Sequence, residues 1–220
     1  MPKELLLALV LGAVLMLLPI EAVFRKHKIP WWKGIFTTAI LTWMGTYATH
    51  IWFLVENGNM EGRSYYGAVF LVPIGFVLVA LLLRIPYGKL MDACAPAECI
   101  MLVIMKVKCM MDGCCGGKVL KVLEDGTQVR FPSQIAEMIN ALVLLVILLL
   151  LALRMKRPGY VYAWYLILYG VTRFGLNHFR ADQSVFAFGL APGAFWSVWA
   201  VIIGLVCLIV LTVVYRIRRN

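Results

Sequence analysis

The sequence predicts an all-α fold, that of a polytopic membrane protein with about seven transmembrane helices, and two observations support this. Of the 220 residues, 63% are hydrophobic and only 15% are charged. The apolar residues lie in runs close to the length of about 20 helical residues that crosses a hydrocarbon core of roughly 30 Å. A soluble domain of this length needs more polar side chains to cover its surface, so soluble protein classes are excluded.

The apolar runs give the expected helices in chain order. They cover residues 4–24, 34–55, 65–84, 94–111, 134–153, 159–179 and 194–215. Turn residues and charges fill the connections, as at His27 to Pro30 and at Pro86 to Lys89. Nothing repeats at a fixed period, and no linker rich in serine or proline divides the chain. Residues 1–220 are therefore expected to form a single integral membrane domain.

Basic residues mark alternate connections between these spans. The basic clusters lie at residues 25–33, 84–89, 154–157 and 216–219, whereas the other connections carry Glu56, Glu61, Glu124, Asp125 and Asp182. Short basic loops face the cytoplasm, so the N-terminus is expected outside and the C-terminus inside. A cleaved signal peptide is not expected, because the strongest positive charge follows the first span. The net charge of +10 thus reflects membrane topology, and no motif suggests a nucleic acid partner.

The sixth expected helix carries a polar stripe. At about 100° per residue, one face of this helix receives Tyr162, Tyr169, Arg173, Asn177 and Arg180. A charged group in a membrane span is costly unless it pairs or meets water, so this face is a candidate functional surface. Guanidinium groups match phosphate oxygens, and both arginines lie towards the outer end of the span. A phospholipid phosphate is the expected ligand, and His178, which lies off the stripe, is interpreted as interfacial packing.

A second polar stretch, MKVKCMMDGCCGGK at residues 105–118, closes the fourth span. Lys106 lies on the helix face that leads to a cluster of glycines, and Asp112 suits a helix end at the membrane interface. The adjacent Cys114 and Cys115 have neither C-x-x-C spacing nor a nearby histidine, so no metal and no other cofactor is expected. A vicinal disulfide or a redox-active thiol stays open as an alternative.

A third stretch, FPSQIAEMIN at residues 131–140, opens the fifth span. Ser133 or Gln134 is placed to satisfy free backbone N–H groups at the start of this helix. Glu137 enters the membrane one turn later and needs a cationic partner. Arg173 or Arg180 can supply it.

The fourth stretch, GRSYYGA at residues 62–68, opens the third span from the same outer side. It brings Arg63, Ser64 and Tyr66 towards the polar residues of the other three stretches. All four stretches therefore converge near one membrane face. Such convergence predicts one shared site.

Taken in this order, the four stretches resemble the prolipoprotein diacylglyceryl transferase family. The family's S-F-H-G-G pattern corresponds to residues 64–68, and its G-R-x-G-N-F-x-N-G-E signature to residues 105–114. Its H-P-S-Q-L-Y-E pattern corresponds to residues 131–137, and its Y-G-x-x-R-F-x-x-E-x-x-R pattern to residues 169–180. The motifs cover about residues 62–182, while the first two spans agree in topology alone. The resemblance implies seven helices with the N-terminus outside, in agreement with the charge distribution.

The resemblance also implies a function. The family moves the diacylglyceryl group of phosphatidylglycerol onto the cysteine thiol of a lipoprotein precursor, at the outer face of the bacterial inner membrane. The expected partners are therefore the phospholipid and a thiol or another nucleophile as acceptor. The residues implied in catalysis are Tyr66, Lys106, Cys114 and Arg173. The residues implied in substrate binding are Ser64, Asp112, Gln134, Glu137, Tyr169, Asn177 and Arg180.

Several positions depart from the family pattern. They are Tyr66 in place of histidine, Lys106 in place of arginine, Cys109 and Cys114 in place of asparagine and glutamate, and Asn177 in place of a later glutamate. Arg173 and Arg180 are kept. Phosphate recognition is therefore expected to persist, whereas proton transfer is expected to differ because tyrosine is a poor general base at neutral pH.

Two other functions remain open. A non-catalytic phospholipid-binding protein would keep the headgroup pocket and lose the chemistry, as the departures at Tyr66 and Cys114 would allow. A membrane thiol-redox protein would instead cycle Cys109, Cys114 or Cys115. A transporter is disfavoured, because the polar residues gather at one face and do not line a path across the midplane.

Overall fold

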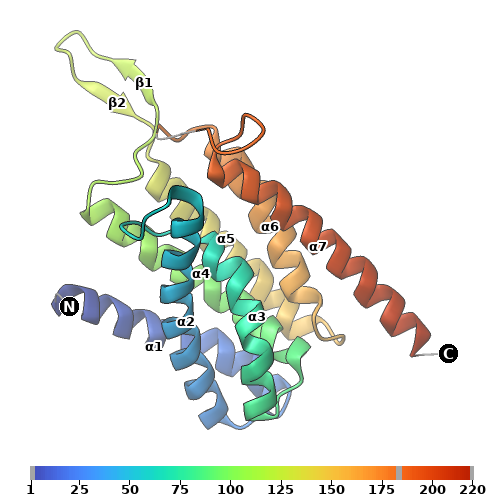
Figure 1. Cartoon of the computed structure of the whole chain (residues 1–220). Coiled ribbons are helices and arrows are strands. Elements are labelled where there is room, and N and C mark those ends of the chain that lie inside the picture. Colours follow the sequence, from blue (N-terminus) through green and yellow to red (C-terminus); the bar gives the residue numbers. More distant parts are fainter. Residues whose placement is uncertain (1–2, 182–184, 219–220) are drawn as a thin grey trace.

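The computed structural model describes residues 3–181 and 185–218, with side chains from residue 10 onward. Asp182 and Arg219, which contribute to the predicted charge pattern, lie outside the described residues. The described chain forms seven α-helices and one β-hairpin (Figure 1). The helices are α1 (Lys3–Lys26), α2 (Trp31–Asn57), α3 (Tyr66–Leu83), α4 (Tyr87–Met111), α5 (Ser133–Arg154), α6 (Tyr160–Asn177) and α7 (Pro192–Ile217). The strands are β1 (Val119–Val122) and β2 (Gln128–Arg130).

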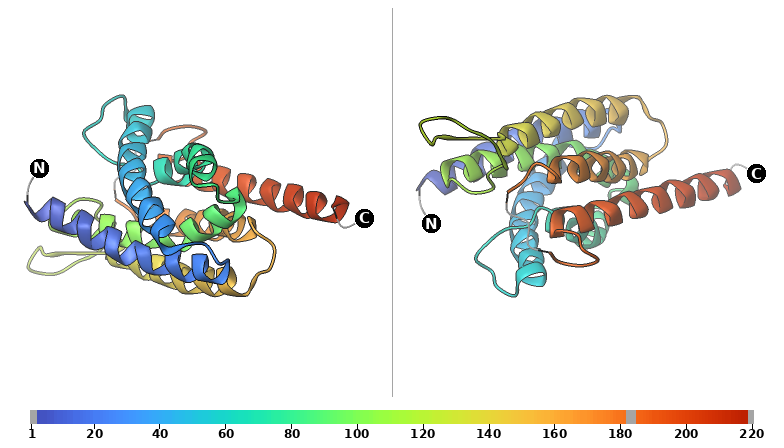
Figure 2. Two further views of the ribbon diagram at one scale, coloured as in Figure 1. Left: turned by 90° about the horizontal axis from the view of Figure 1, so that it is seen from below. Right: turned by 90° about the horizontal axis from the view of Figure 1, so that it is seen from above.

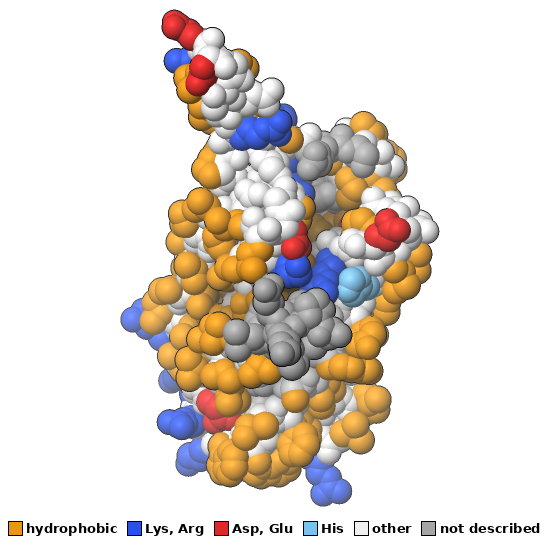
Figure 3. All heavy atoms as spheres, turned by 90° about the vertical axis from the view of Figure 1, so that its left-hand side faces the viewer, with side chains coloured by type: hydrophobic (Ala, Val, Ile, Leu, Met, Phe, Trp, Pro, Cys, Tyr) orange, Lys and Arg blue, Asp and Glu red, His pale blue; other side chains and the backbone are white. Residues whose placement is uncertain are grey.

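The helices fit a polytopic membrane protein. By length and composition, α3, α5 and α7 are each apolar enough to cross a bilayer. Large hydrophobic side chains are exposed along most of the helices, and Figure 3 shows them covering the flank of the molecule, with Lys and Arg side chains gathered at its lower end. An apolar flank between charged ends is the surface that a bilayer requires.

One helix starts earlier than the sequence predicts. The expected start at residue 94 was wrong, since α4 begins at Tyr87 and includes Asp92. The Asp92 carboxylate is buried, and it accepts hydrogen bonds from the backbone N–H groups of Gly159 at 2.7 Å and Val161 at 3.0 Å. It therefore satisfies the free amides at the start of α6, and the favourable end of that helix dipole stabilises the carboxylate. Asp92, which the sequence places in a connection between two spans, is thus part of the core.

The long connection at residues 112–132, expected as a loop, contains an antiparallel hairpin. Strands β1 and β2 pair through Lys121 with Val129 and Val122 with Gln128, and the hairpin projects from one end of the bundle (Figure 1). Asp125 closes the turn by accepting a hydrogen bond from the Thr127 N–H at 2.9 Å. Both strands are fully exposed, so no burial pattern marked them in the sequence.

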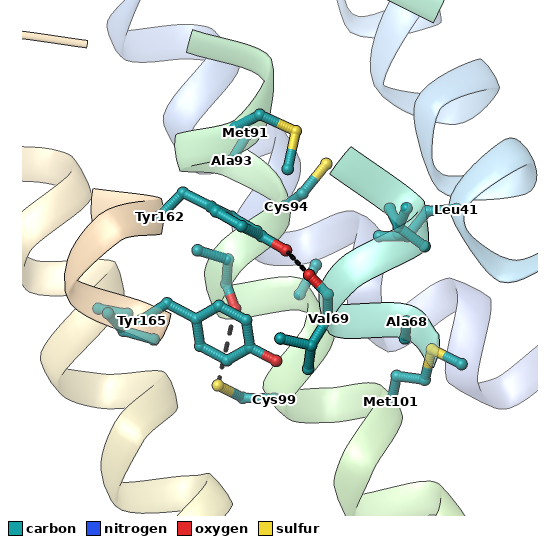
Figure 4. Packing of buried hydrophobic residues seen from close by; sticks show 14 of the residues in the cluster. Leu41, Ala68, Val69, Met91, Ala93, Cys94, Cys99, Met101, Tyr162 and Tyr165 are labelled. Carbon is teal, nitrogen blue, oxygen red and sulfur yellow. Dashed lines mark hydrogen bonds between the residues drawn. The ribbon is translucent and has the colours of Figure 1, made fainter. Parts of the chain in front are cut away.

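Helix α4 lies at the centre of the bundle and packs against α1, α3, α5 and α6. Small side chains such as Ala93 and Cys94 line its buried face and let the neighbouring helices approach closely. Tyr162 and Tyr165 of α6 fill the space beside them (Figure 4). The Tyr162 hydroxyl donates a hydrogen bond to the Val69 carbonyl oxygen at 2.9 Å, which ties α6 to α3. Tyr162, expected on the functional stripe, therefore belongs to the core.

Helix α7 leaves the bundle at its C-terminal end. Its buried residues are small and lie in its first half, at Ala194, Ser197, Ala200 and Gly204. Beyond them the helix contacts the start of α6, where the Tyr215 hydroxyl donates a hydrogen bond to the Pro158 carbonyl oxygen at 3.0 Å, and its C-terminal end extends past the other helices (Figure 2). Between α7 and the nearby parts of α3, α4 and α6 lies an apolar groove of about 860 Å³.

A close contact between α2 and α3 gives a test of the packing. A Cβ atom added at Gly67 would lie 1.9 Å from the Ala48 carbonyl oxygen, so the backbone would have to move. We expect Gly67→Ala to lower the free energy of unfolding by about 1–3 kcal/mol. Thermal unfolding in detergent measures this as a lower midpoint. Gly175→Ala on α6 is the matched control, because a Cβ there meets nothing within 4 Å; equal midpoints would contradict the close approach.

Candidate active site

The convergence expected from the four polar stretches is present as a cavity of about 400 Å³. It lies at the end of the bundle from which the hairpin projects, and α2, α3, α4, α5, α6 and the start of α7 all contribute to its wall. The predicted site residues that line it are Ser64, Tyr66, Lys106, Glu137, Tyr169, Arg173, Asn177 and Arg180. Residues distant in sequence are therefore brought to one place, as the sequence predicted.

A single carboxylate organises the charges of the cavity. Glu137 forms ion pairs with Arg173 at 2.7 Å, Lys106 at 2.8 Å and Arg180 at 3.2 Å. The predicted pairing of Glu137 with an arginine is confirmed, and it includes both arginines and the lysine. The four side chains are between 3% and 15% exposed, so water screens their charges little.

The cluster carries more positive than negative charge. Three cations share one carboxylate, so the group has a net charge of about +2 with all groups ionised. The Arg173 Nη1 atom is buried and has the Glu137 carboxylate as its partner, at 2.7 Å. Buried charge that is not fully balanced is costly. An anion that enters this cavity would supply the missing negative charge.

Each member of the cluster sits on a different, separately anchored segment. Lys106 comes from α4, Glu137 from the second turn of α5, and Arg173 from α6. Arg180 follows the end of α6, where its backbone forms a bridge with Gly117. A Cβ at Gly117 would lie 2.0 Å from the carbonyl oxygen of Phe131, so glycine is required for this approach. The base of the hairpin thus holds Arg180 beside the other cations.

Tyr66 lies at the inner wall of the cavity in a chain of hydroxyl groups. Its hydroxyl is 2.5 Å from the Ser197 Oγ, and Ser197 donates to the Gly193 carbonyl oxygen at 2.6 Å. The Tyr66 hydroxyl also donates to the Gly193 carbonyl oxygen at 3.2 Å, so both hydroxyl groups converge on this oxygen. The Tyr66 ring packs against Phe70 and Tyr169, with ring centroids 5.7 Å apart in both cases. Tyr66 is therefore a fixed, protonated hydroxyl facing the cavity.

The sequence did not identify Glu56 as a site residue. The charge pattern of the sequence indicates an acidic residue that offsets the positive charge of an outer connection. Glu56 lies in the last turns of α2, lines the cavity and accepts a hydrogen bond from the Ser64 Oγ at 2.8 Å. Gly193 at the start of α7 was also missed, and a Cβ there would lie 2.7 Å from the Asn177 Oδ1. The signal for Glu56 was its position at a span end directly before the Ser64 stretch.

The start of α5 contacts the cysteine loop. The expected capping role of Ser133 or Gln134 was wrong, because α5 has no side-chain cap. Instead, the Ser133 Oγ donates to the Cys115 carbonyl oxygen at 2.6 Å, and the Gln134 Nε2 donates to the Cys114 carbonyl oxygen at 2.7 Å. These two bonds fix the cysteine backbone at the edge of the cavity, so the Pro-Ser-Gln segment acts on the loop after α4.

The cysteines differ in their relation to the cavity. Cys109 and Cys115 line it, whereas Cys114 is exposed and does not. The contact with the Cys109 thiol, whose sulfur lies 3.8 Å away, and the positive charges of Lys106 and Arg180 lower the pKa of the Cys115 thiol. Cys109 and Cys115, and not the predicted Cys114, thus share the cavity with the cation cluster, and the catalytic role of Cys114 stays a prediction.

Two further predicted residues lie away from the cation cluster. Asp112 is exposed and forms a surface ion pair with Lys108 at 2.6 Å. Gln134 does not line the cavity and contacts it only through the Cys114 backbone. His178 is exposed, with its Nδ1 3.3 Å from the Phe174 carbonyl oxygen, which agrees with interfacial packing. The binding roles of Asp112 and Gln134 therefore stay predictions.

Comparison with known proteins agrees with the motifs. The family model for prolipoprotein diacylglyceryl transferase matches residues 7–210. A phosphatidylglycerol–prolipoprotein diacylglyceryl transferase of Dehalococcoides mccartyi is 27% identical over 174 residues, which cover 73% of this chain and 64% of the relative. The protein of the same name from Campylobacter hominis is 30% identical over 176 residues, which cover 72% of this chain and 61% of the relative.

The matches to the relatives and the match to the family model cover different lengths of the chain. The chain spans slightly less than two thirds of the length of these relatives, but the family model reaches from α1 to α7 and includes every residue of the cation cluster. With the four motifs in order and their side chains gathered at one cavity, the chain belongs to the prolipoprotein diacylglyceryl transferase family.

Proposed function

We propose that this protein is a diacylglyceryl transferase with phosphatidylglycerol as the donor and the cysteine thiol of a lipoprotein precursor, or another nucleophile, as the acceptor. The observation that carries the proposal is the cluster of three cations around Glu137 in a cavity near one end of an apolar bundle. A cationic cavity at the end of a membrane protein matches a phospholipid headgroup in both charge and depth.

The proposed topology follows from the same arrangement. All seven helices cross the membrane, the N-terminus and the cavity face the outer side, and the C-terminus lies in the cytoplasm. The basic connections 25–33, 84–89 and 154–157 support this orientation through the positive-inside rule. The membrane is then the bacterial inner membrane, and residues 1–220 act as one domain.

The phosphate of the donor binds between the cations. Arg173 and Arg180 present planar N–H groups to its oxygens, Lys106 adds a point charge, and Glu137 keeps all three side chains in position. Asn177 and Ser64, which line the same cavity, are placed to bind the hydroxyl groups of the headgroup. Asp112 and Gln134 take part through the loop that closes the outer side.

The acyl chains of the donor lie in the apolar groove between α3 and α7. The groove adjoins the cavity, because Phe70 of the groove stacks on Tyr66 of the cavity. Its lining is almost entirely apolar, and its volume of about 860 Å³ suits hydrocarbon chains. Headgroup and chains of one lipid are thereby held on either side of Tyr66.

The reaction is a substitution at the glycerol carbon that bears the phosphate ester. The acceptor sulfur, as a thiolate, forms a bond to this carbon while the carbon–oxygen bond to phosphate breaks. The electron pair of that bond leaves with glycerol phosphate, and the thiol proton passes to water. The cation cluster binds the departing phosphate, which gains negative charge, more strongly than it binds the phosphate ester of the donor lipid. This difference in binding accelerates the step.

Tyr66 is proposed to position the acceptor. Its hydroxyl donates to the Gly193 carbonyl oxygen, so its oxygen is proposed to accept a hydrogen bond from the incoming group. We expect Tyr66→Phe to lower kcat/KM by about tenfold, which is the effect of one lost hydrogen bond. The ring and its packing on Tyr169 remain in this variant. A loss of a thousandfold or more would instead make Tyr66 the base that deprotonates the acceptor.

The direct test uses the purified full chain in detergent. It is incubated with phosphatidylglycerol labelled in the diacylglyceryl group and with a peptide that contains a lipoprotein cysteine. Lipidated peptide and released glycerol phosphate in equal amounts are expected. A peptide with serine in place of the cysteine is the control. If phospholipid co-purifies with the protein but no diacylglyceryl group is transferred, the proposed enzymatic activity is wrong. The protein would then be a phospholipid-binding protein.

A further inference from the structure

Three thiols that the proposed transfer does not use lie together beside the cavity. The sulfur atoms of Cys109, Cys114 and Cys115 all lie within 4.8 Å of one another. The Cys109 and Cys115 sulfurs are 3.8 Å apart, and all three cysteines are free thiols. The spacing of Cys114 and Cys115 did not predict a metal site, because the third sulfur comes from the last turns of α4 and only the fold shows that it points to the same place.

The loop that carries the thiols has a fixed backbone. Cys115 has a φ of +61°, which is a strained conformation for a residue other than glycine, and Gly113 has a φ of +66°. The carbonyl groups of Cys114 and Cys115 are held by the side chains of Gln134 and Ser133. A strained backbone that persists because two outside groups hold it indicates pre-organisation. The structure therefore maintains the sulfur triad without a disulfide between these three cysteines.

The ligand set and its surroundings select the kind of ion. Within the described residues, the group contains sulfur ligands only, with no histidine or carboxylate. Thiolate ligands select soft metal ions, of which Cu(I) accepts three sulfurs in a plane and Zn(II) prefers four ligands. Lys106 and Arg180 line the same cavity as Cys115. Their positive charges, which they share with Glu137, offset part of the two negative charges of a complex of Cu(I) with three thiolates.

We propose that Cys109, Cys114 and Cys115 form a binding site for one Cu(I) ion at the edge of the cavity. On binding, the three cysteines coordinate as thiolates, any proton that a thiol still carries passes to the buffer, three copper–sulfur bonds form, and no electron is transferred. Copper binding does not require lipid transfer, so this proposal stands or falls independently of the proposed function. An ion bound there would protect the three thiols from oxidation.

The test is a titration of the full chain, purified in detergent without oxygen, with Cu(I) against a chelator that competes for the ion. One Cu(I) per chain is expected, with the ultraviolet absorption of a copper–thiolate bond. Replacement of Cys109 or Cys115 by serine is expected to weaken Cu(I) binding by about 100-fold or more. Loss of a residue that only supports a metal ligand already has an effect approaching this size, and here a ligand itself is lost. Cys114→Ser is the safest variant for folding, since Cys114 is exposed. Cys207→Ser on α7 is the matched control and is expected to bind as the wild type does.

Several results would overturn the proposal. One is equal Cu(I) affinity in the wild type and in the variant that lacks all three thiols, with both shown to be helical by circular dichroism. Another is a disulfide between Cys109 and Cys115 in the oxygen-free preparation, detected by alkylation and mass spectrometry. A third is binding of Cd(II) or Zn(II) at the triad with no binding of Cu(I), which would assign the thiols to a divalent ion. Because no step of this test measures lipid transfer, its failure is distinct from a failure of the proposed function.

Discussion

Arg173→Gln is expected to reduce kcat/KM for lipid transfer by roughly 10³-fold, the largest effect of any single substitution in the cavity. Arg173 makes the shortest contact with Glu137, at 2.7 Å, and lines the cavity. It is therefore the cation held most closely at the centre of the cluster, where the leaving phosphate is proposed to bind. Glu137 keeps Lys106 and Arg180 as partners in the variant, so the fold is expected to persist. Initial rates with labelled phosphatidylglycerol and a cysteine peptide measure the effect.

Two comparison variants separate charge from geometry. Arg173→Lys keeps the charge and loses the planar fork, and a loss intermediate between wild type and Arg173→Gln is expected. Arg154→Gln removes an exposed arginine at the opposite end of the molecule and is expected to leave the rate unchanged. Wild-type activity in Arg173→Gln, with unchanged thermal unfolding, would show that the phosphate does not bind at the cation cluster. The mechanism proposed above would then be wrong.

Glu137→Gln is expected to destabilise the protein strongly. The substitution leaves Lys106, Arg173 and Arg180 together with no carboxylate between them, and each is at most 15% exposed. Breaking a buried ion pair by removing one partner costs about 3–5 kcal/mol. A large fall in the midpoint of thermal unfolding and loss of transfer are expected, whereas Glu124→Gln on the exposed hairpin should change neither.

A double variant tests whether charge is the cause. Lys106→Met in the Glu137→Gln background removes one of the unpaired cations while it keeps the length of the side chain. The double variant is expected to unfold at a higher temperature than Glu137→Gln alone, with a coupling of about 0.5–3 kcal/mol between the two positions. A midpoint at or below that of Glu137→Gln would show that Glu137 stabilises the structure through packing and not through its charge.

The helices were predictable because hydrophobic runs of bilayer length set them. Six of the seven described helices begin and end within about three residues of the sequence-based ranges. The start of α4 was missed because Lys89 and Asp92 look like a connection, and only the fold shows that Asp92 meets the free amides of α6. The hairpin was missed because both of its strands are exposed and carry no alternating pattern.

The charged part of the site was predictable for a different reason. Charged residues are rare in membrane spans and are costly there unless they are paired. The few present, such as Glu137 and Arg173, were therefore expected to pair with one another. Glu56 escaped notice because a carboxylate at a span end has an ordinary explanation in headgroup water. The interaction of Ser133 and Gln134 with the cysteine loop was also unpredictable, because it joins segments whose approach depends on the whole bundle.

The departure of α7 from the bundle also bears on how the rate should be measured. The apolar groove runs beside this helix, and in the proposed topology it faces the bilayer. A donor that arrives through it diffuses in two dimensions, so the quantity that sets the encounter rate is its mole fraction in the membrane or micelle. Added detergent should therefore slow the reaction by dilution in the surface phase, at constant bulk amounts of enzyme and lipid.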